Sequence, residues 1–207
     1  MSRRSKLAFV TGLTLLRLPL MTAFFVGAVI HTLPSQEVWL FVATFAALIA
    51  SALTDAFDGY FARRFGVETK FGAHADPLMD KFFYLASLPL LVFAAAVQPG
   101  HLAHARLLLV LTLLFLARDQ WVTFLRSVGA QYNVSGQANW SGKLRTAVNF
   151  PMICVAYYFE EAPAPWWRPA IGWVYAFEAF ALVLTLVSIA VYSRQYWPHL
   201  RRSTDAD

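Results

Sequence analysis

The chain has 207 residues, of which 58% are hydrophobic and 14% are charged, and its net charge is +5. Soluble domains average roughly 45–50% apolar and about 25% charged residues, so this composition excludes an ordinary soluble domain and indicates a membrane protein. No polar stretch is long enough for a second domain, and residues 1–207 are therefore predicted to form one membrane domain. A basic arm of the kind that binds nucleic acid is absent from the sequence, so the positive charge is expected to meet lipid headgroups.

Six apolar runs predict an all-α integral membrane fold with six transmembrane helices. The runs cover residues 7–30, 38–53, 82–97, 102–117, 147–159 and 171–192. A helix needs about 20 residues to cross the hydrocarbon layer, and several of these runs are shorter. We therefore expect their helices to continue into the polar sequence at their ends.

The distribution of Lys and Arg predicts how the chain is oriented. Six spans place both termini on one side of the membrane, and nearly all of the cations between spans fall on that side. The opposite side receives only Arg106 and Arg168. By the positive-inside rule, both termini and the connecting segments 60–75 and 127–143 are expected in the cytoplasm.

Four of the twelve acidic residues lie at the ends of the second and third apolar runs. Asp55 and Asp58 are three residues apart and Asp76 and Asp80 are four apart, so each pair shares one face of a helix. The length of the second span places both pairs at the cytoplasmic interface, where they face each other across a short connection. Four carboxylates this close repel one another unless cations lie between them. Oxygen ligands of this kind suit Mg²⁺ or Mn²⁺.

Small and basic residues beside these aspartates predict room for a bulky anionic ligand. Gly59 and Ala62 leave space next to the cations, and Arg63 is placed to meet a phosphate. Gly72 allows the connecting backbone to turn sharply or to approach a ligand closely. Each acidic pair alone could be an ordinary solvated helix end or, at Asp76, a helix N-cap. Four carboxylates together, in a chain with few charges, indicate a functional site and not ordinary helix ends.

The run Asp55-x2-Asp58-Gly59-x2-Ala62-Arg63-x8-Gly72-x3-Asp76-x3-Asp80 resembles the complete signature of the CDP-alcohol phosphatidyltransferase family. The resemblance implies a six-helix membrane core that transfers a phosphatidyl group from CDP-diacylglycerol to a small alcohol and releases CMP. A bacterial cytoplasmic membrane and a homodimer are expected with it. It implies two divalent cations, Mg²⁺ or Mn²⁺, held by Asp55, Asp58, Asp76 and Asp80, with Asp80 also acting as general base. It implies that the CDP-lipid is bound by Asp58, Gly59, Ala62, Arg63, Thr69 and Gly72.

Two further segments resemble the phosphatidylglycerophosphate synthase branch of that family. They are residues 11–19, where Thr11 replaces the usual Asn, and residues 142–146, Gly-Lys-Leu-Arg-Thr. A cluster of cations suits an acceptor with its own phosphate, and glycerol 3-phosphate is therefore expected, with inositol phosphate or phosphatidylglycerol as alternatives. The same cations could instead only anchor helices to anionic lipid. The cations expected to converge near the carboxylates are Arg118, Arg126, Lys143 and Arg145.

Two alternatives of a different class are a cation transporter and a non-catalytic scaffold. Acids at one interface disfavour the transporter, because transporter sites lie near the bilayer midplane. Arg17 is expected to snorkel toward the headgroups or to contact substrate. Glu178 is expected to pair with a hydroxyl or cation of a neighbouring helix or to lie at a dimer seam. The scattered histidines His31, His101, His104 and His199 are expected at the interface.

Overall fold

The computed structural model describes residues 2–32, 37–67, 70–134 and 139–204, with side chains except those of residues 55–56, 70–77 and 203–204. The described residues form six helices and no strand, so the predicted all-α fold is confirmed. The helices are α1 (Arg3–Ile30), α2 (Val38–Phe65), α3 (Lys70–Val97), α4 (Leu102–Gln131), α5 (Trp140–Glu161) and α6 (Ile171–Thr204).

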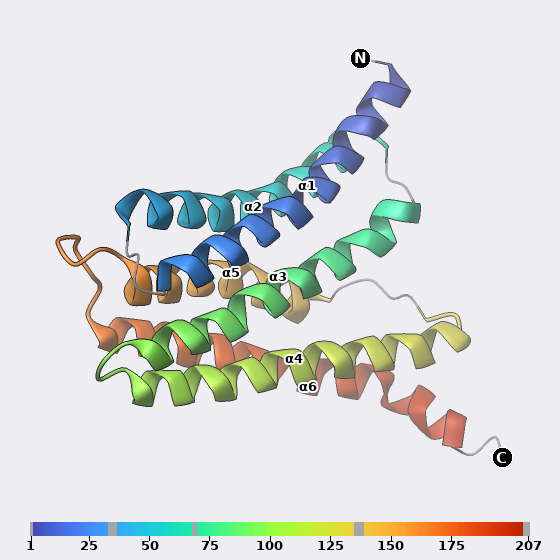
Figure 1. Ribbon diagram of the computed structural model, residues 1–207. Coiled ribbons are helices and arrows are strands. Elements are labelled where there is room, and N and C mark those ends of the chain that lie inside the picture. Colours follow the sequence, from blue (N-terminus) through green and yellow to red (C-terminus); the bar gives the residue numbers. More distant parts are fainter. Residues whose placement is uncertain (1, 33–36, 68–69, 135–138, 205–207) are drawn as a thin grey trace.

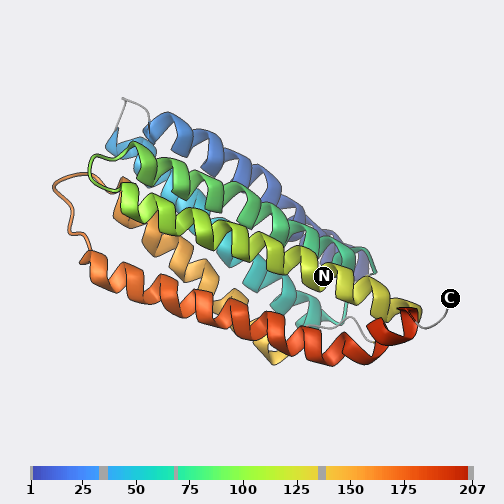
Figure 2. The ribbon, with the colours of Figure 1, turned by 90° about the horizontal axis from the view of Figure 1, so that it is seen from below.

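The helices run along one bundle, and both termini lie at the same end of it (Figure 1, Figure 2). We call this end the terminal end. Neighbouring helices close a ring in the order α1, α2, α5, α6, α4 and α3, and α3 also contacts α5 across the ring. Side chains on the inner faces of α3 and α5 are therefore placed to meet groups from several other helices.

Every helix extends past its apolar run at the terminal end. This confirms the prediction that the helices continue into polar sequence, and much of the described part of the connecting segments 60–75 and 127–143 is helical. Charged side chains do not prevent a helix where they can leave the hydrocarbon. Glycine ends α2 instead: Gly66 has a φ of +60° and donates its N–H to the carbonyls of Ala62 and Arg63. At the start of α5, the side chain of Asn139 accepts the N–H of Gly142 at 3.0 Å.

Several helices are long and apolar enough to cross a bilayer, which makes the chain a multi-pass membrane protein. Among the described residues these are α1, α2, the Leu78–Val97 part of α3, α4 and the Ile171–Arg202 part of α6. Helix α5 is not among them, because polar residues such as Arg145, Asn149 and Glu160 are buried on its inner side. The six-span count and the cytoplasmic position of the termini stay predictions.

A buried polar cluster lies at the opposite end of the bundle. His104 of α4 is 0% exposed. Its Nδ1 lies 2.5 Å from Glu160 Oε1 of α5, and its Nε2 lies 2.8 Å from Glu178 Oε1 of α6. His31 is also buried, against the carbonyl of Glu161. Acidic partners on other helices hold these two histidines inside the bundle, and their position relative to the membrane interface stays a prediction. Glu178 pairs with a neighbouring helix, as predicted.

Candidate active site

A buried arginine joins the first three helices near the terminal end. Arg17 of α1 is 1% exposed. Its Nη2 donates to Asp58 Oδ2 of α2 at 2.9 Å, and its Nη1 donates to Asp80 Oδ1 of α3 at 3.4 Å. Thr14, three residues earlier on α1, also donates to Asp58 Oδ2, at 3.1 Å. The prediction that Arg17 snorkels was wrong, because two carboxylates inside the bundle are nearer partners than the headgroups.

Two of the four aspartates predicted to hold cations meet at this arginine. Asp58 of α2 and Asp80 of α3 converge on one positive group, the guanidinium of Arg17 from α1. Asp55 lies on α2 and Asp76 on α3, one turn from these two, but their side chains fall outside the described residues. Among the side chains that are described, no group of three or more His, Cys, Asp or Glu could hold a metal ion. The N-cap alternative at Asp76 was wrong, because α3 begins at Lys70.

The predicted donor contacts lie along the last turns of α2. Gly59 and Ala62 are half-buried and Arg63 is exposed. A Cβ added at Gly59 would lie 3.4 Å from Arg63 Nη1, so the guanidinium folds back over the glycine, beside Asp58. Thr69 lies outside the described residues. Gly72 is inside α3, so the backbone does not turn sharply there, and close approach of a ligand at this glycine stays a prediction.

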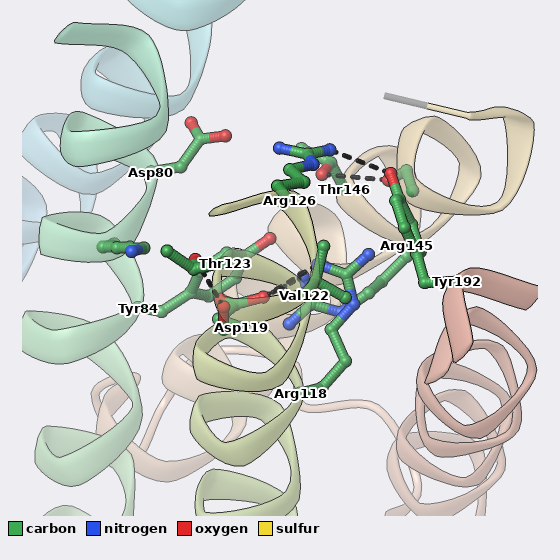
Figure 3. Close-up of a pocket in the computed structure, with 12 residues that line it drawn as sticks. Asp80, Tyr84, Arg118, Asp119, Val122, Thr123, Arg126, Arg145, Thr146 and Tyr192 are labelled. Atoms are coloured by element: carbon green, nitrogen blue, oxygen red, sulfur yellow. Dashed lines mark hydrogen bonds and ion pairs between the residues drawn. The ribbon is translucent and has the colours of Figure 1, made fainter. Parts of the chain in front are cut away.

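A pocket of about 190 Å³ opens beside Asp80. Figure 3 shows its side chains converging from α3, α4, α5 and α6. Asp80 therefore belongs both to the Arg17 cluster and to the wall of this pocket. A molecule bound in the pocket would lie next to the carboxylate predicted to be the general base. The charged residues of the lining are Asp80, Lys81, Arg118, Asp119, Arg126 and Arg145.

The pocket has more cations than acids, and some of its donors are unused. Asp119 Oδ1 accepts from Arg118 Nη1 at 2.9 Å and pairs with Arg145 Nη1 at 3.1 Å. The Nε and Nη2 of Arg145 and the Nε of Arg126 are buried and have no hydrogen-bond partner within the described part of the chain. Each unpaired buried donor costs about 1–3 kcal/mol. An anion that accepts these donors would remove that cost, and the excess of positive charge suits a phosphate monoester.

Tyr192 of α6 holds two of these arginines. Its hydroxyl accepts from Arg126 Nη2 at 2.9 Å and from the backbone N–H of Asn139 at 3.2 Å. The guanidinium carbons of Arg118 and Arg126 lie 5.2 and 5.3 Å from the centre of its ring. A Cβ added at Gly142 would lie only 2.9 Å from the Tyr192 hydroxyl. The glycine of the 142–146 segment therefore leaves the space that this tyrosine occupies.

The structure brings together three of the four cations predicted to bind the acceptor. Lys143 is exposed and is not among the residues that line the pocket, so its role stays a prediction. The lining residues that were not predicted as ligands include Tyr84, Asp119 and Tyr192. Asp119 follows Arg118 directly, and this acid–base neighbourhood was a usable signal. The sequence did not indicate a pocket role for the two tyrosines, because aromatic residues at the ends of apolar runs are also typical of a membrane interface.

Residues 9–191 match the family model of the CDP-alcohol phosphatidyltransferases. The chain is 32% identical over 168 residues to a CDP-diacylglycerol–glycerol-3-phosphate 3-phosphatidyltransferase of Pseudomonas fluorescens, and the match covers 79% of each chain. A protein of the same name from Salmonella typhimurium is 32% identical over 187 residues, 88% of this chain and 91% of that protein. A cardiolipin synthase (CMP-forming) of Oryza sativa subsp. japonica is 29% identical over 180 residues. This last match covers 83% of the chain but 54% of the rice protein.

Proposed function

The chain belongs to the CDP-alcohol phosphatidyltransferase family, and from that premise we propose that it transfers a phosphatidyl group from CDP-diacylglycerol to glycerol 3-phosphate and releases CMP. The observation that carries this choice of acceptor is the pocket beside Asp80, where buried donors of Arg126 and Arg145 lack partners among the described residues. The names of the bacterial relatives support the same reaction. Its product belongs to phospholipid synthesis.

Different residues of the pocket bind the acceptor and take part in the transfer. Arg118, Arg126 and Arg145 bind the phosphate of the acceptor, and Lys143 is proposed as a further contact at the rim. The hydroxyl at the other end of this small molecule then faces Asp80, which takes its proton as general base. The hydroxyl oxygen forms a bond to the phosphorus that carries diacylglycerol, and the bond from this phosphorus to the oxygen of CMP breaks.

Four aspartates are proposed to hold two divalent cations, Mg²⁺ or Mn²⁺: Asp55, Asp58, Asp76 and Asp80. When bound, the cations would neutralise the negative charge of the donor diphosphate and the charge that develops on the leaving CMP. Arg17 keeps the carboxylates of Asp58 and Asp80 turned toward each other. The donor is proposed to contact Asp58, Gly59, Ala62, Arg63, Thr69 and Gly72.

The membrane setting follows from the charge distribution. We propose that the chain forms one domain with six spans in a bacterial cytoplasmic membrane and that the terminal end faces the cytoplasm. The support is the concentration of Lys and Arg at that end. A water-soluble acceptor then reaches the pocket from the cytoplasm, while the acyl chains of the donor stay in lipid. A homodimer is expected from the family resemblance alone.

A second acceptor of the same reaction is phosphatidylglycerol. The similarity to the rice cardiolipin synthase favours it, and its headgroup is also a phosphate linked to glycerol. A phosphate diester carries one negative charge, whereas a phosphate monoester carries up to about two. The excess of cations in the pocket therefore favours glycerol 3-phosphate. Inositol phosphate has the same terminal phosphate and is the remaining alternative.

Release of CMP tests the proposal. The full chain is purified in detergent and given radiolabelled CDP-diacylglycerol and Mg²⁺, together with glycerol 3-phosphate, inositol phosphate, phosphatidylglycerol or unphosphorylated glycerol. We expect release of CMP with glycerol 3-phosphate and formation of labelled phosphatidylglycerol phosphate. Release of CMP only with phosphatidylglycerol would show that glycerol 3-phosphate is not the acceptor. If no acceptor led to release of CMP, the hypothesis of a transferase would be refuted and that of a cation transporter would be favoured.

A further inference from the structure

Asp119 of α4 is an acidic residue of the pocket beside Asp80 that has no role in the steps above. Its side chain is 11% exposed and lines the pocket together with Asp80. The contacts of Asp119 with Arg118 and Arg145 both fall on its Oδ1. Within the described part of the chain no side chain donates to its Oδ2, and this oxygen is not closed off from solvent. One oxygen of the carboxylate is therefore open to a donor from a bound molecule.

A carboxylate in this place is unfavourable for the phosphate that the pocket is proposed to bind, because like charges repel. Support of the arginines does not by itself account for Asp119, since both guanidinium groups have other contacts. Arg118 donates from Nε and Nη2 to Ser188 Oγ at 3.1 and 2.6 Å. The guanidinium carbon of Arg145 lies 5.1 and 5.3 Å from the centres of two aromatic rings. The open oxygen of Asp119 is therefore available for a further contact, with a group that donates a hydrogen bond.

A hydroxyl of the acceptor is the donor that fits this oxygen. In the proposed complex the phosphate of glycerol 3-phosphate lies at Arg126 and Arg145 and its reacting hydroxyl lies at Asp80, so the middle carbon with its own hydroxyl lies between them. Asp119 and Asp80 come from neighbouring helices and line the same pocket (Figure 3). We propose that Asp119 accepts a hydrogen bond from this middle hydroxyl and so selects acceptors that carry one, an inference that rests on the function proposed above.

Two threonine hydroxyls of the same pocket are weaker candidates for this contact. Thr123 Oγ1 donates to the backbone carbonyl of Asp119 at 2.7 Å, and Thr146 Oγ1 donates to that of Gly142 at 3.2 Å. Each hydroxyl has already used its proton and can only accept from a ligand. A charged acceptor makes a hydrogen bond roughly twice as strong as a neutral one. The carboxylate therefore determines which acceptor is preferred.

The contact predicts discrimination against an acceptor that lacks the middle hydroxyl. 3-Hydroxypropyl phosphate keeps the phosphate and the reacting hydroxyl of glycerol 3-phosphate but carries only hydrogen on its middle carbon. With this molecule Oδ2 of Asp119 loses its partner, while the phosphate contacts and the general base stay as they are. Loss of a hydrogen bond to a charged group corresponds to a factor of about 10–100. We expect kcat/KM of the unsubstituted protein to be lower by this factor for 3-hydroxypropyl phosphate.

Substitution of Asp119 separates this contact from support of the arginines. Asp119→Ala removes both carboxylate oxygens, and Asp119→Asn keeps the size of the side chain and one oxygen for the arginines. Both variants should lower kcat/KM for glycerol 3-phosphate. The ratio of kcat/KM for the two acceptors should fall to about one in Asp119→Ala and to an intermediate value in Asp119→Asn. Thr123→Val removes a hydroxyl from the same pocket and should keep the ratio of the unsubstituted protein.

Three results would overturn the inference. A ratio near one in the unsubstituted protein would show that no residue recognises the middle hydroxyl. Equal losses with both acceptors in the Asp119 variants would assign Asp119 to support of the arginines or to base catalysis. A fall of the ratio in Thr123→Val as large as in Asp119→Ala would move the contact to the threonine. If the unsubstituted protein releases no CMP with glycerol 3-phosphate, the proposed function itself has failed, and this result is distinct from an unchanged ratio.

A second measurement uses the mirror image of the acceptor. sn-Glycerol 1-phosphate has the same groups and charge as sn-glycerol 3-phosphate, but its middle hydroxyl points the other way. We expect the unsubstituted protein to prefer sn-glycerol 3-phosphate by about tenfold or more in kcat/KM, and we expect this preference to weaken in Asp119→Asn. A preference that is the same in the variant and in the unsubstituted protein would show that another residue reads the hydroxyl and would overturn the inference.

Discussion

Arg17 and Asp58 form an ion pair at 2.9 Å between α1 and α2, and the two side chains are 1% and 4% exposed. Burying both charges costs free energy that only close pairing and further hydrogen bonds offset. The contacts from Arg17 to Asp80 and from Thr14 to Asp58 supply such bonds. The pair therefore fixes the position of the carboxylates on which the proposed cation site depends.

Removing the cation of this pair should destabilise the protein most when no metal is present. Arg17→Met leaves Asp58 buried without that partner, a change that typically costs about 3–5 kcal/mol. We expect a lower Tm in EDTA and a smaller loss in Mg²⁺, because a bound cation replaces the missing charge. Scanning calorimetry in detergent measures both values. Arg106→Met removes an exposed arginine and is the control. A Tm loss independent of Mg²⁺ would contradict the predicted cation site.

Asp80→Asn separates catalysis from donor binding. The amide keeps the size of the side chain but cannot take a proton from the acceptor, so kcat should fall by about 10²–10⁴. Arg17 can still donate to the amide oxygen, and the affinity for CDP-diacylglycerol should change little. Single-turnover release of CMP and equilibrium binding of a fluorescent donor give the two quantities. Unchanged turnover would remove Asp80 from the role of base.

Arg126 lines the acceptor pocket and Lys143 does not, so their replacement should change the KM for the acceptor to different degrees. Arg126→Gln removes a guanidinium that lines the pocket, and a hydrogen bond to a charged group contributes about 1.5–3 kcal/mol. We expect the KM for glycerol 3-phosphate to rise at least about tenfold, with a smaller change in kcat. Lys143→Gln removes a cation that is exposed outside the lining and should raise this KM less. The reverse order would show that the acceptor binds nearer Lys143.

Gly142→Ala tests the shape of the same pocket by adding one methyl group. The added Cβ would lie 2.9 Å from the Tyr192 hydroxyl and 3.5 Å from Arg118 Nη2. We expect Tyr192 to shift and the KM for the acceptor to rise about tenfold, because Arg126 loses its fixed partner. Gly172→Ala is the matched control, since nothing lies within 4 Å of its added Cβ. Equal kinetics for both variants would refute the proposed role of Gly142.

The buried cluster at the opposite end predicts a change in stability. His104→Leu leaves Glu160 and Glu178 buried without the imidazole between them, and should cost about 3–5 kcal/mol of unfolding free energy. Glu160 still pairs with His101 at 2.7 Å, but adding Glu160→Gln and Glu178→Gln removes both buried carboxylate charges and should restore part of the loss. Denaturant titration followed by tryptophan fluorescence compares the single and triple variants. A triple variant less stable than the single one would show that the carboxylates stabilise the fold without His104.

The helical placement of the four aspartates could be predicted because helical spacing is a local property. The spacing of Asp55, Asp58, Asp76 and Asp80 requires only that each pair lie on a helix, and α2 and α3 contain them. The partner of a buried charge is not local. Arg17 and Asp58 are 41 residues apart, and His104 and Glu178 are 74 residues apart. Spacing along one helix does not reveal such pairs.

The amino-acid sequence by itself determined the all-α membrane fold, because apolar runs of this length have few other stable forms in lipid. It also determined the acidic motif that places the chain in its family. Only the tertiary structure decided that Arg17 turns inward and that Arg118, Arg126 and Arg145 share a pocket with Asp80 while Lys143 lies outside it. The physical reason is that these relations depend on which helices become neighbours in the ring, and helix packing sets that order.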